Sequence, residues 1–95
     1  GMEFYQAALE VGALIEDLDI ADLQKLISES RNADVKVVYQ NLVKGSRNHL
    51  RAFARQLERY AGDYVPQYIT TAEYQQIVTS RNETGVITDA DFSFE

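Results

Sequence analysis

Apolar residues recur at helical spacing through the first third of the chain. The stripe consists of Phe4, Ala8, Val11, Ile15 and Leu18. Steps of three and four residues place these side chains on one face of an α-helix. The pattern therefore predicts a helix here, with this stripe directed into the core.

A break is expected near Asp19. An aspartate is a favourable N-cap, and Asp22 follows three residues later, where a carboxylate suits the first turn of a helix. Leu23, Leu26 and Ile27 then give the following residues an apolar side of their own. We expect a second, short helix after Asp19.

The next helix is predicted to be the longest. The polar stretch 28–32 reads as a helix connection, with Asn32 as the N-cap. A helix from about Ala33 to about Tyr60 would measure roughly 40 Å, at 1.5 Å per residue. Its core-facing stripe, mainly of apolar or small residues at helical spacing, consists of Val35, Val38, Leu42, Gly45 or Ser46, His49, Phe53, Leu57 and Tyr60.

Gly62 and Pro66 are expected to follow the end of that helix. Thr70 and Glu73 then form a capping-box pattern, which predicts a short helix through about Val78. The remainder has no periodicity, so we divide the chain into a helical domain, 2–78, and an irregular tail, 79–95. Phe92 and Phe94 could dock this tail on a neighbour.

These elements predict an all-α fold, a helical hairpin with a short third helix. Two long helices cannot bury two apolar stripes between them, because one side of each rod stays in water. A four-helix bundle is the usual solution, and two hairpins related by a two-fold axis would supply it. A homodimer is therefore expected.

Composition limits the classes of function. The chain has 95 residues, enough for one small domain, and 45% of them are hydrophobic. A net charge of −6 argues against nucleic-acid binding. There is no apolar run long enough to span a membrane and no basic leader, and cysteine is absent. We expect a cytoplasmic protein without a membrane partner.

The candidate chemistry centres on the only histidine, His49, and on Glu16. Both are expected on core-facing sides, next to small residues, whereas Asp17 is expected to be exposed. A buried imidazole and a buried carboxylate each require a partner. They could form a hydrogen-bonded pair, or they could ligate a metal ion. Asp19 is a possible additional ligand.

Five basic residues are predicted to share the side of the long helix opposite His49. They are Lys44, Arg47, Arg51, Arg55 and Arg59. A solvated face that pairs with the many acidic residues is the expected role, and an anion-binding patch is the alternative. The sequence has no nucleophile and base set and no Gly-rich phosphate loop, so no reaction or substrate is predicted.

Three segments resemble an uncharacterised ferritin-like family, the domain of unknown function 2202. They are ALEVGALIEDLDIADL (8–23), GSRNHLRAF (45–53) and YVPQYI (64–69). The resemblance implies a ferritin-like bundle, in which inward Glu and Glu-x-x-His residues can hold metal ions. Glu16 matches the acidic position of the third bundle helix, and His49 matches the histidine of the fourth.

The chain departs from the family pattern in two ways. Position 46, three residues before His49, is serine and not glutamate. The resemblance also covers only the C-terminal half of the family's domain, so the chain is either a shortened product or a natural half that dimerises. In a dimer, two Glu16 and two His49 side chains would suit one zinc or iron ion.

Three functions follow as hypotheses. The first is a ferritin-like homodimer with a vestigial metal site at Glu16 and His49. The second is a structural or protein-interaction module without metal. The third is an iron-dependent oxidoreductase, which rests on analogy of fold alone.

Overall fold

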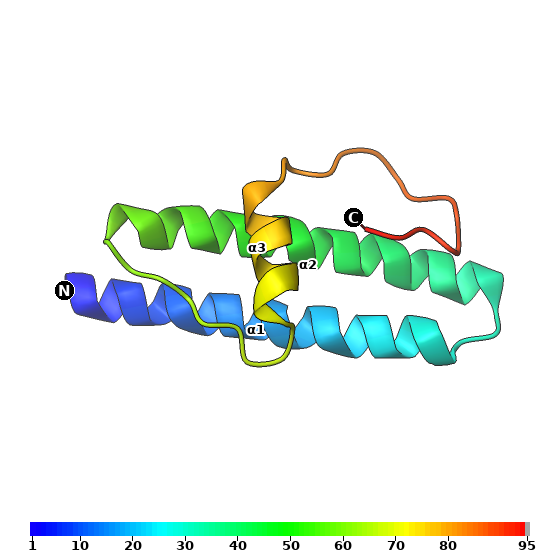
Figure 1. Cartoon of the computed structure of the whole chain (residues 1–95), viewed down its shortest axis with the longest axis horizontal. Coiled ribbons are helices and arrows are strands. Elements are labelled where there is room, and N and C mark those ends of the chain that lie inside the picture. Colours follow the sequence, from blue (N-terminus) through cyan, green and yellow to red (C-terminus); the bar gives the residue numbers. More distant parts are fainter. Residues whose placement is uncertain (95) are drawn as a thin grey trace.

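The fold is a helical hairpin crossed by a short third helix. The structure is a computed structural model that describes residues 1–94; Glu95, the last residue of the predicted tail 79–95, lies outside the described residues. Helix α1 spans Met2–Glu29, α2 spans Ala33–Arg59 and α3 spans Thr71–Thr79. The first two are antiparallel rods, and α3 crosses over them (Figure 1). The predicted all-α class is confirmed.

Helix α1 is continuous, so the predicted break at Asp19 is wrong. Asp19 is an exposed residue in the interior of the helix. No glycine or proline follows Gly12 within α1, and most residues around Asp19 are good helix formers such as Leu, Ala, Gln and Lys. A residue that is favourable as an N-cap does not interrupt a helix that has no other reason to stop.

The N-caps of the other two helices agree with the sequence. The Asn32 side chain accepts a hydrogen bond from the Val35 amide at 3.1 Å, and α2 begins at the next residue, Ala33. The Thr70 hydroxyl accepts from the Glu73 amide, also at 3.1 Å, and opens α3. Each side-chain oxygen thus satisfies one of the free amides of a first turn.

Helix α2 ends in a Schellman motif. The Gly62 amide donates to the Leu57 carbonyl at 2.9 Å, and the Ala61 amide donates to the Glu58 carbonyl at 3.1 Å. The left-handed residue of this motif is Ala61, with φ of 54°, where glycine is usual. The helix ends at Arg59, one residue before the predicted end near Tyr60 and three residues before Gly62.

The core lies where the two long helices meet α3 and the segment before it. Its buried apolar members are Leu9, Ala13, Ile20, Val43, Leu50, Leu57, Tyr64, Ile69, Tyr74 and Ile77. Helix α1 thus buries a different stripe from the predicted one. Phe4, Val11 and Ile15 are 78%, 56% and 52% exposed. The helix is apolar on more than one side, and only one side meets the rest of the chain.

Residues 80–90 run back along α2 and the chain then turns and returns beside it (Figure 1), so the irregular tail lies against α2 of its own chain. Side chains of α2 bind the backbone of this segment, for example Asn41 at Ile87. Phe92 and Phe94 dock on the chain's own Arg47. Among the helices described over residues 1–94, none is long and apolar enough to cross a membrane.

Candidate functional site

One broad face of the hairpin is apolar and open to solvent. The large, exposed side chains of the two long helices include Phe4, Ile15, Leu18, Leu26, Val35, Val38 and Leu42, and Val11 is exposed nearer to residues 63–67. A groove of about 590 Å³ runs between the two helices on this face, and Leu23, Leu26 and Leu42 form part of its apolar lining. A helix that is apolar on both sides is typical of a bundle interior.

Glu16 and His49 meet in this groove. The His49 Nδ1 atom lies 3.3 Å from a Glu16 carboxylate oxygen, with the Glu16 side chain 13% exposed and that of His49 68% exposed. The sequence thus correctly paired the two residues. The prediction that His49 is buried in the core is wrong for the single chain, because the ring lies on the open side of α2.

The donor set of one chain does not fit a metal ion. Asp19 lines the same groove as Glu16 and His49. However, across residues 1–94 no three side chains among His, Asp and Glu come together as possible ligands. Ser46, which stands where a Glu-x-x-His motif would have its carboxylate, is buried beside the groove. A metal ion would need further ligands from outside this chain.

The predicted solvated basic face is wrong for two of its five members. Arg47 and Arg51 are only 3% and 2% exposed. Arg47 holds Glu83 with two bonds of 2.7 Å, and Arg51 lies 3.0 Å from the same carboxylate. Burial alone would raise the pKa of Glu83, but the bonds and charges of Arg47 and Arg51 outweigh it and hold that pKa below 4.5.

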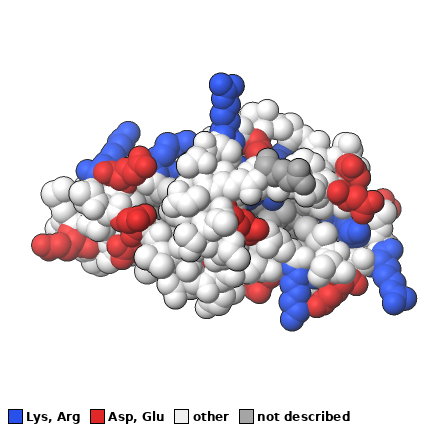
Figure 2. Space-filling model, in the orientation of Figure 1, with Lys and Arg blue, Asp and Glu red and all other residues white. Residues whose placement is uncertain are grey.

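Charges of both signs are interspersed over the face that carries α3 (Figure 2). Arg47 and Arg51 are buried, so these two do not belong to a solvent-exposed basic patch. They act inside the fold, where they join α3 and the segment after it to α2.

Asp17 is the residue that the sequence analysis missed. It was expected to be exposed, yet its exposed fraction is 0%. Its carboxylate accepts the Tyr64 hydroxyl and the Gln67 amide, each at 2.6 Å. It also accepts the Tyr68 amide at 3.1 Å and the Ile69 amide at 2.7 Å. These bonds, which we call the Asp17 clamp, fix the segment before α3 to the middle of α1.

A signal for this burial does exist in the sequence. Asp17 stands at helical spacing with Leu9, Ala13 and Ile20, which form the buried stripe of α1. A carboxylate in phase with a core stripe needs several donors. Those donors come from a loop about fifty residues away, and no local sequence pattern indicates them.

The clamp changes the chemistry of Tyr64. Burial, together with the hydrogen bond to Asp17 and the negative charge of Asp17, raises the pKa of Tyr64 far above its ordinary value of 10.0. Burial also raises the pKa of Tyr74, whose ring lies 5.8 Å from that of Tyr64, centroid to centroid. Both phenols thus remain protonated well into the alkaline range.

The fold and the groove define a class of protein: an antiparallel helical hairpin with a carboxylate–imidazole pair on an uncovered apolar face. Residues 2–81 match the family model described as "Uncharacterized protein domain (DUF2202)". The chain belongs to this family, as the resemblance implied.

The chain is also similar to uncharacterized protein MJ0754 of Methanocaldococcus jannaschii. The two are 58% identical over 79 residues, which are 83% of this chain and 43% of MJ0754. The crystal structure of hypothetical protein MJ0754 from Methanococcus jannaschii DSM 2661 matches with a TM-score of 0.79 and 59% identity. This match covers 80% of this chain and 43% of that one. The chain thus spans less than half the length of the relative it matches.

Proposed function

We propose that the protein is a self-associating helical module, in which two copies cover each other's apolar face and complete a ferritin-like four-helix bundle. The observation that carries this proposal is the row of exposed, large apolar side chains on α1 and α2. Such a face is much more extensive than the scattered apolar residues of an ordinary monomer surface. The family membership supports the module but assigns it no reaction.

The energy of covering this face is sufficient for a dimer. A large aliphatic side chain gains roughly 1.5–3 kcal/mol when it is fully removed from water. Val11, Ile15, Val38 and Leu42 are each more than half exposed. Two copies of the whole face would gain on the order of 10–20 kcal/mol. Association costs about 4–15 kcal/mol, so the gain offsets this cost over most of the two ranges.

A second copy is the occupant we propose because the face is self-complementary in layout. It consists of two antiparallel helices of nearly equal length, Met2–Glu29 and Ala33–Arg59. A two-fold axis through the middle of such a hairpin brings the same surface of both copies into contact and gives a closed dimer. The other half of a longer chain, such as the one MJ0754 possesses, is the rival occupant.

Sedimentation velocity at micromolar concentration tests the proposal. We expect the wild-type chain to sediment as a dimer, and Ile15→Glu or Leu42→Glu to weaken association at least tenfold. Val86→Glu is the matched control, because Val86 is 78% exposed but lies on the segment after α3. A folded wild-type monomer whose sedimentation is unchanged by Ile15→Glu would contradict the proposal.

A metal centre shared between two copies is a second candidate function. Glu16 lies at the middle of α1, and His49 lies three residues beyond the middle of α2. A central two-fold axis would therefore bring two carboxylates and two imidazoles near one another. This donor set suits zinc or iron, and Asp19 of each copy could supplement it.

Metal analysis of the purified dimer tests this second candidate. We expect stoichiometric zinc or iron in the wild-type protein and its loss in His49→Ala, while Arg59→Ala serves as a control on α2. Absence of stoichiometric binding by wild type would eliminate the metal centre. The dimer proposal would be unaffected, because sedimentation tests it separately.

A further inference from the structure

The segment after α3 lies along α2 and is bound by its side chains, in the manner of a peptide bound to a receptor. We define the strap as residues 83–94. No helix or strand forms within it, and Ile87 is its one buried residue. It is held mainly by side chains of α2. Residues 83–88 run antiparallel to that helix, since Asn48 contacts Glu83 whereas Asn41 contacts Ile87. A turn then reverses the chain, with the Phe92 amide donating to the Asp89 carbonyl at 3.2 Å, so that Phe94 lies over Arg47 and Arg51.

Two asparagines of α2 bind the strap backbone in the same manner. The Asn41 side chain accepts from the Ile87 amide and donates to the Ile87 carbonyl, both at 2.9 Å. The Asn48 side chain accepts from the Glu83 amide at 2.9 Å and donates to the Glu83 carbonyl at 3.0 Å. Each primary amide thus replaces the two hydrogen bonds that a neighbouring β-strand would make.

The spacing of these asparagines fits an extended ligand. Seven residues of helix separate Asn41 from Asn48, about 10.5 Å along the axis. Four residues separate Glu83 from Ile87, at most about 13–14 Å when extended. Gln40 binds the turn that follows, where its side-chain amide donates to the carbonyls of Ala90 and Phe92 at 3.1 and 3.0 Å. Recognition through the main chain is tolerant of sequence.

Specificity comes from three side-chain sites. The buried guanidinium groups of Arg47 and Arg51 hold the Glu83 carboxylate. Ile87 is buried. The Arg47 guanidinium carbon lies 5.8 and 4.7 Å from the ring centroids of Phe92 and Phe94, within cation–π range.

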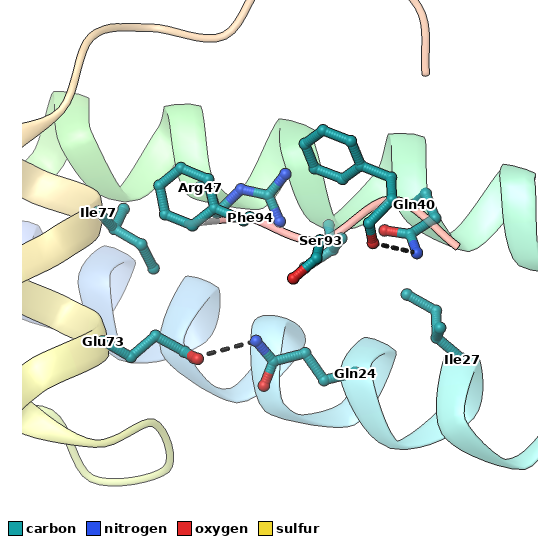
Figure 3. Close-up of a pocket in the computed structure, with 10 residues that line it drawn as sticks. Gln24, Ile27, Gln40, Arg47, Glu73, Ile77, Ser93 and Phe94 are labelled. Carbon is teal, nitrogen blue, oxygen red and sulfur yellow. Dashed lines mark hydrogen bonds between the residues drawn. The ribbon is translucent and has the colours of Figure 1, made fainter. Parts of the chain in front are cut away.

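The aromatic end of the strap does not fill its site. Phe94 and Ser93 border a cavity of about 260 Å³ between the long helices and α3 (Figure 3). Gln24 of α1 and Glu73 of α3 close one side of it with a hydrogen bond of 3.0 Å. A ligand with a larger aromatic group at this position would find room there.

The strap also lies outside the family domain. The family match ends at residue 81, whereas all the α2 residues that hold the strap lie within the match. We propose that this surface of α2 is a binding site for an acidic peptide of a separate protein partner, extended at its start and turned before its aromatic end, and that the strap occupies it in cis. The ligand pattern is Glu-x-x-x-Ile-x-x-x-x-Phe-x-Phe, or a tighter relative of it.

Occupancy in cis sets the affinity that a partner must reach. A short tether gives the strap an effective concentration in the millimolar range. An identical strap from a second copy therefore competes poorly, which is why we assign the site to a different partner. A partner with a bulkier aromatic residue could gain from the cavity beside Phe94.

Fluorescence anisotropy with a labelled peptide of residues 82–94 tests the site in the 95-residue chain. We expect weak binding to the wild-type chain and at least tenfold tighter binding to Ile87→Asp/Phe94→Ser, in which the strap is weakened. Adding Asn41→Leu to that variant should remove the gain. Adding Gln76→Leu, an exposed amide of α3, should not. A strap-weakened chain that stays helical but binds no tighter than wild type would overturn the proposal.

A measurement on the wild-type chain covers the case in which the double variant does not fold. The proposal requires the strap to open without global unfolding. In hydrogen exchange, the Ile87 amide should therefore exchange at least tenfold faster than the amide of Leu50 in the core. Equal exchange of both amides would show the strap to be an inseparable part of the core.

A dimer that survives Ile15→Glu and is lost in Ile87→Asp would indicate strap exchange between copies, which would overturn the assignment to a separate partner.

Discussion

Among single residues, Asp17 has the largest structural consequence. A buried carboxylate is tolerated only when donors surround it, and Tyr64 and three backbone amides do so here. Glu16, its neighbour in sequence, faces the groove on the open side of the hairpin. Two adjacent acids thus have separate places, one in the interior of the chain and one in the open groove, on the face for which we propose self-association.

Asp17→Asn is expected to destabilise the fold by about 2–4 kcal/mol, because an amide offers one acceptor oxygen and turns two donors toward N–H groups. At roughly 4–8 °C per kcal/mol, a thermal melt at neutral pH should reveal this loss clearly. Asp19→Asn, an exposed change on the same helix, should stay within about 0.5 kcal/mol of wild type. Equal effects of the two substitutions would contradict the clamp.

The raised pKa of Tyr64 predicts an alkaline limit to stability. A group whose pKa is higher in the folded state contributes fully below its unfolded value, here 10.0, and loses that contribution as pH rises toward the folded value. We expect the free energy of unfolding, measured with urea, to fall above about pH 10. Tyr64→Phe should lower stability by about 1–2 kcal/mol at pH 7 and flatten this decline. Tyr68→Phe, at a site 54% exposed, should change neither.

Prediction from sequence succeeded or failed at the residue level for a physical reason. Asn32 and Thr70 were predicted as caps because their partners lie three residues away. Asp17 and Arg47 were placed in solvent because their partners, Tyr64 and Glu83, lie 47 and 36 residues away. Local chemistry can be read from spacing, whereas a buried charge depends on which distant segment folds over it.

Among the elements, α1 and α2 approach closely at Gly12. A Cβ atom at Gly12 would lie 2.5 Å from ring atoms of Phe53 on α2, so the ring would have to move. Gly45, on the facing helix, has nothing within 4 Å of such an atom. The two glycines therefore have different roles, although both sit in long helices.

Gly12→Ala is expected to cost about 1–3 kcal/mol through overpacking. Gly45→Ala should instead stabilise α2 by about 0.5–1 kcal/mol, because alanine loses less backbone entropy in a helix. Urea unfolding of both variants provides the comparison. A gain in stability for Gly12→Ala would mean that the contact with Phe53 is not as close as described.

The helices themselves were predictable, whereas their orientation was not. The stripe from Phe4 to Leu18 correctly predicted a helix, but α1 carries a second buried stripe that includes Leu9 and Ile20. When a helix has two apolar faces, periodicity identifies both but does not show which of them is buried within the chain. The predicted bundle would use both faces, one within the chain and one between copies.

For the whole molecule, the proposed dimer links stability to concentration. A tenfold rise in protein concentration favours a dimer by about 1.4 kcal/mol, so the thermal midpoint should increase with concentration. Differential scanning calorimetry over two decades of concentration provides the measurement. Ile15→Glu should remove this dependence. A midpoint of the wild-type chain that is independent of concentration would count against self-association.

The Asp17 clamp also has a consequence for the order in which the molecule folds. A short connection joins α1 to α2, so the contacts of this hairpin can form at a small cost in loop-closure entropy. The clamp joins positions about fifty residues apart and needs the hairpin in place before its donors can converge. We expect it to form after the rate-limiting barrier. Its loss should then accelerate unfolding and leave the folding rate almost unchanged, which makes Asp17 a determinant of how long the native state lasts once formed.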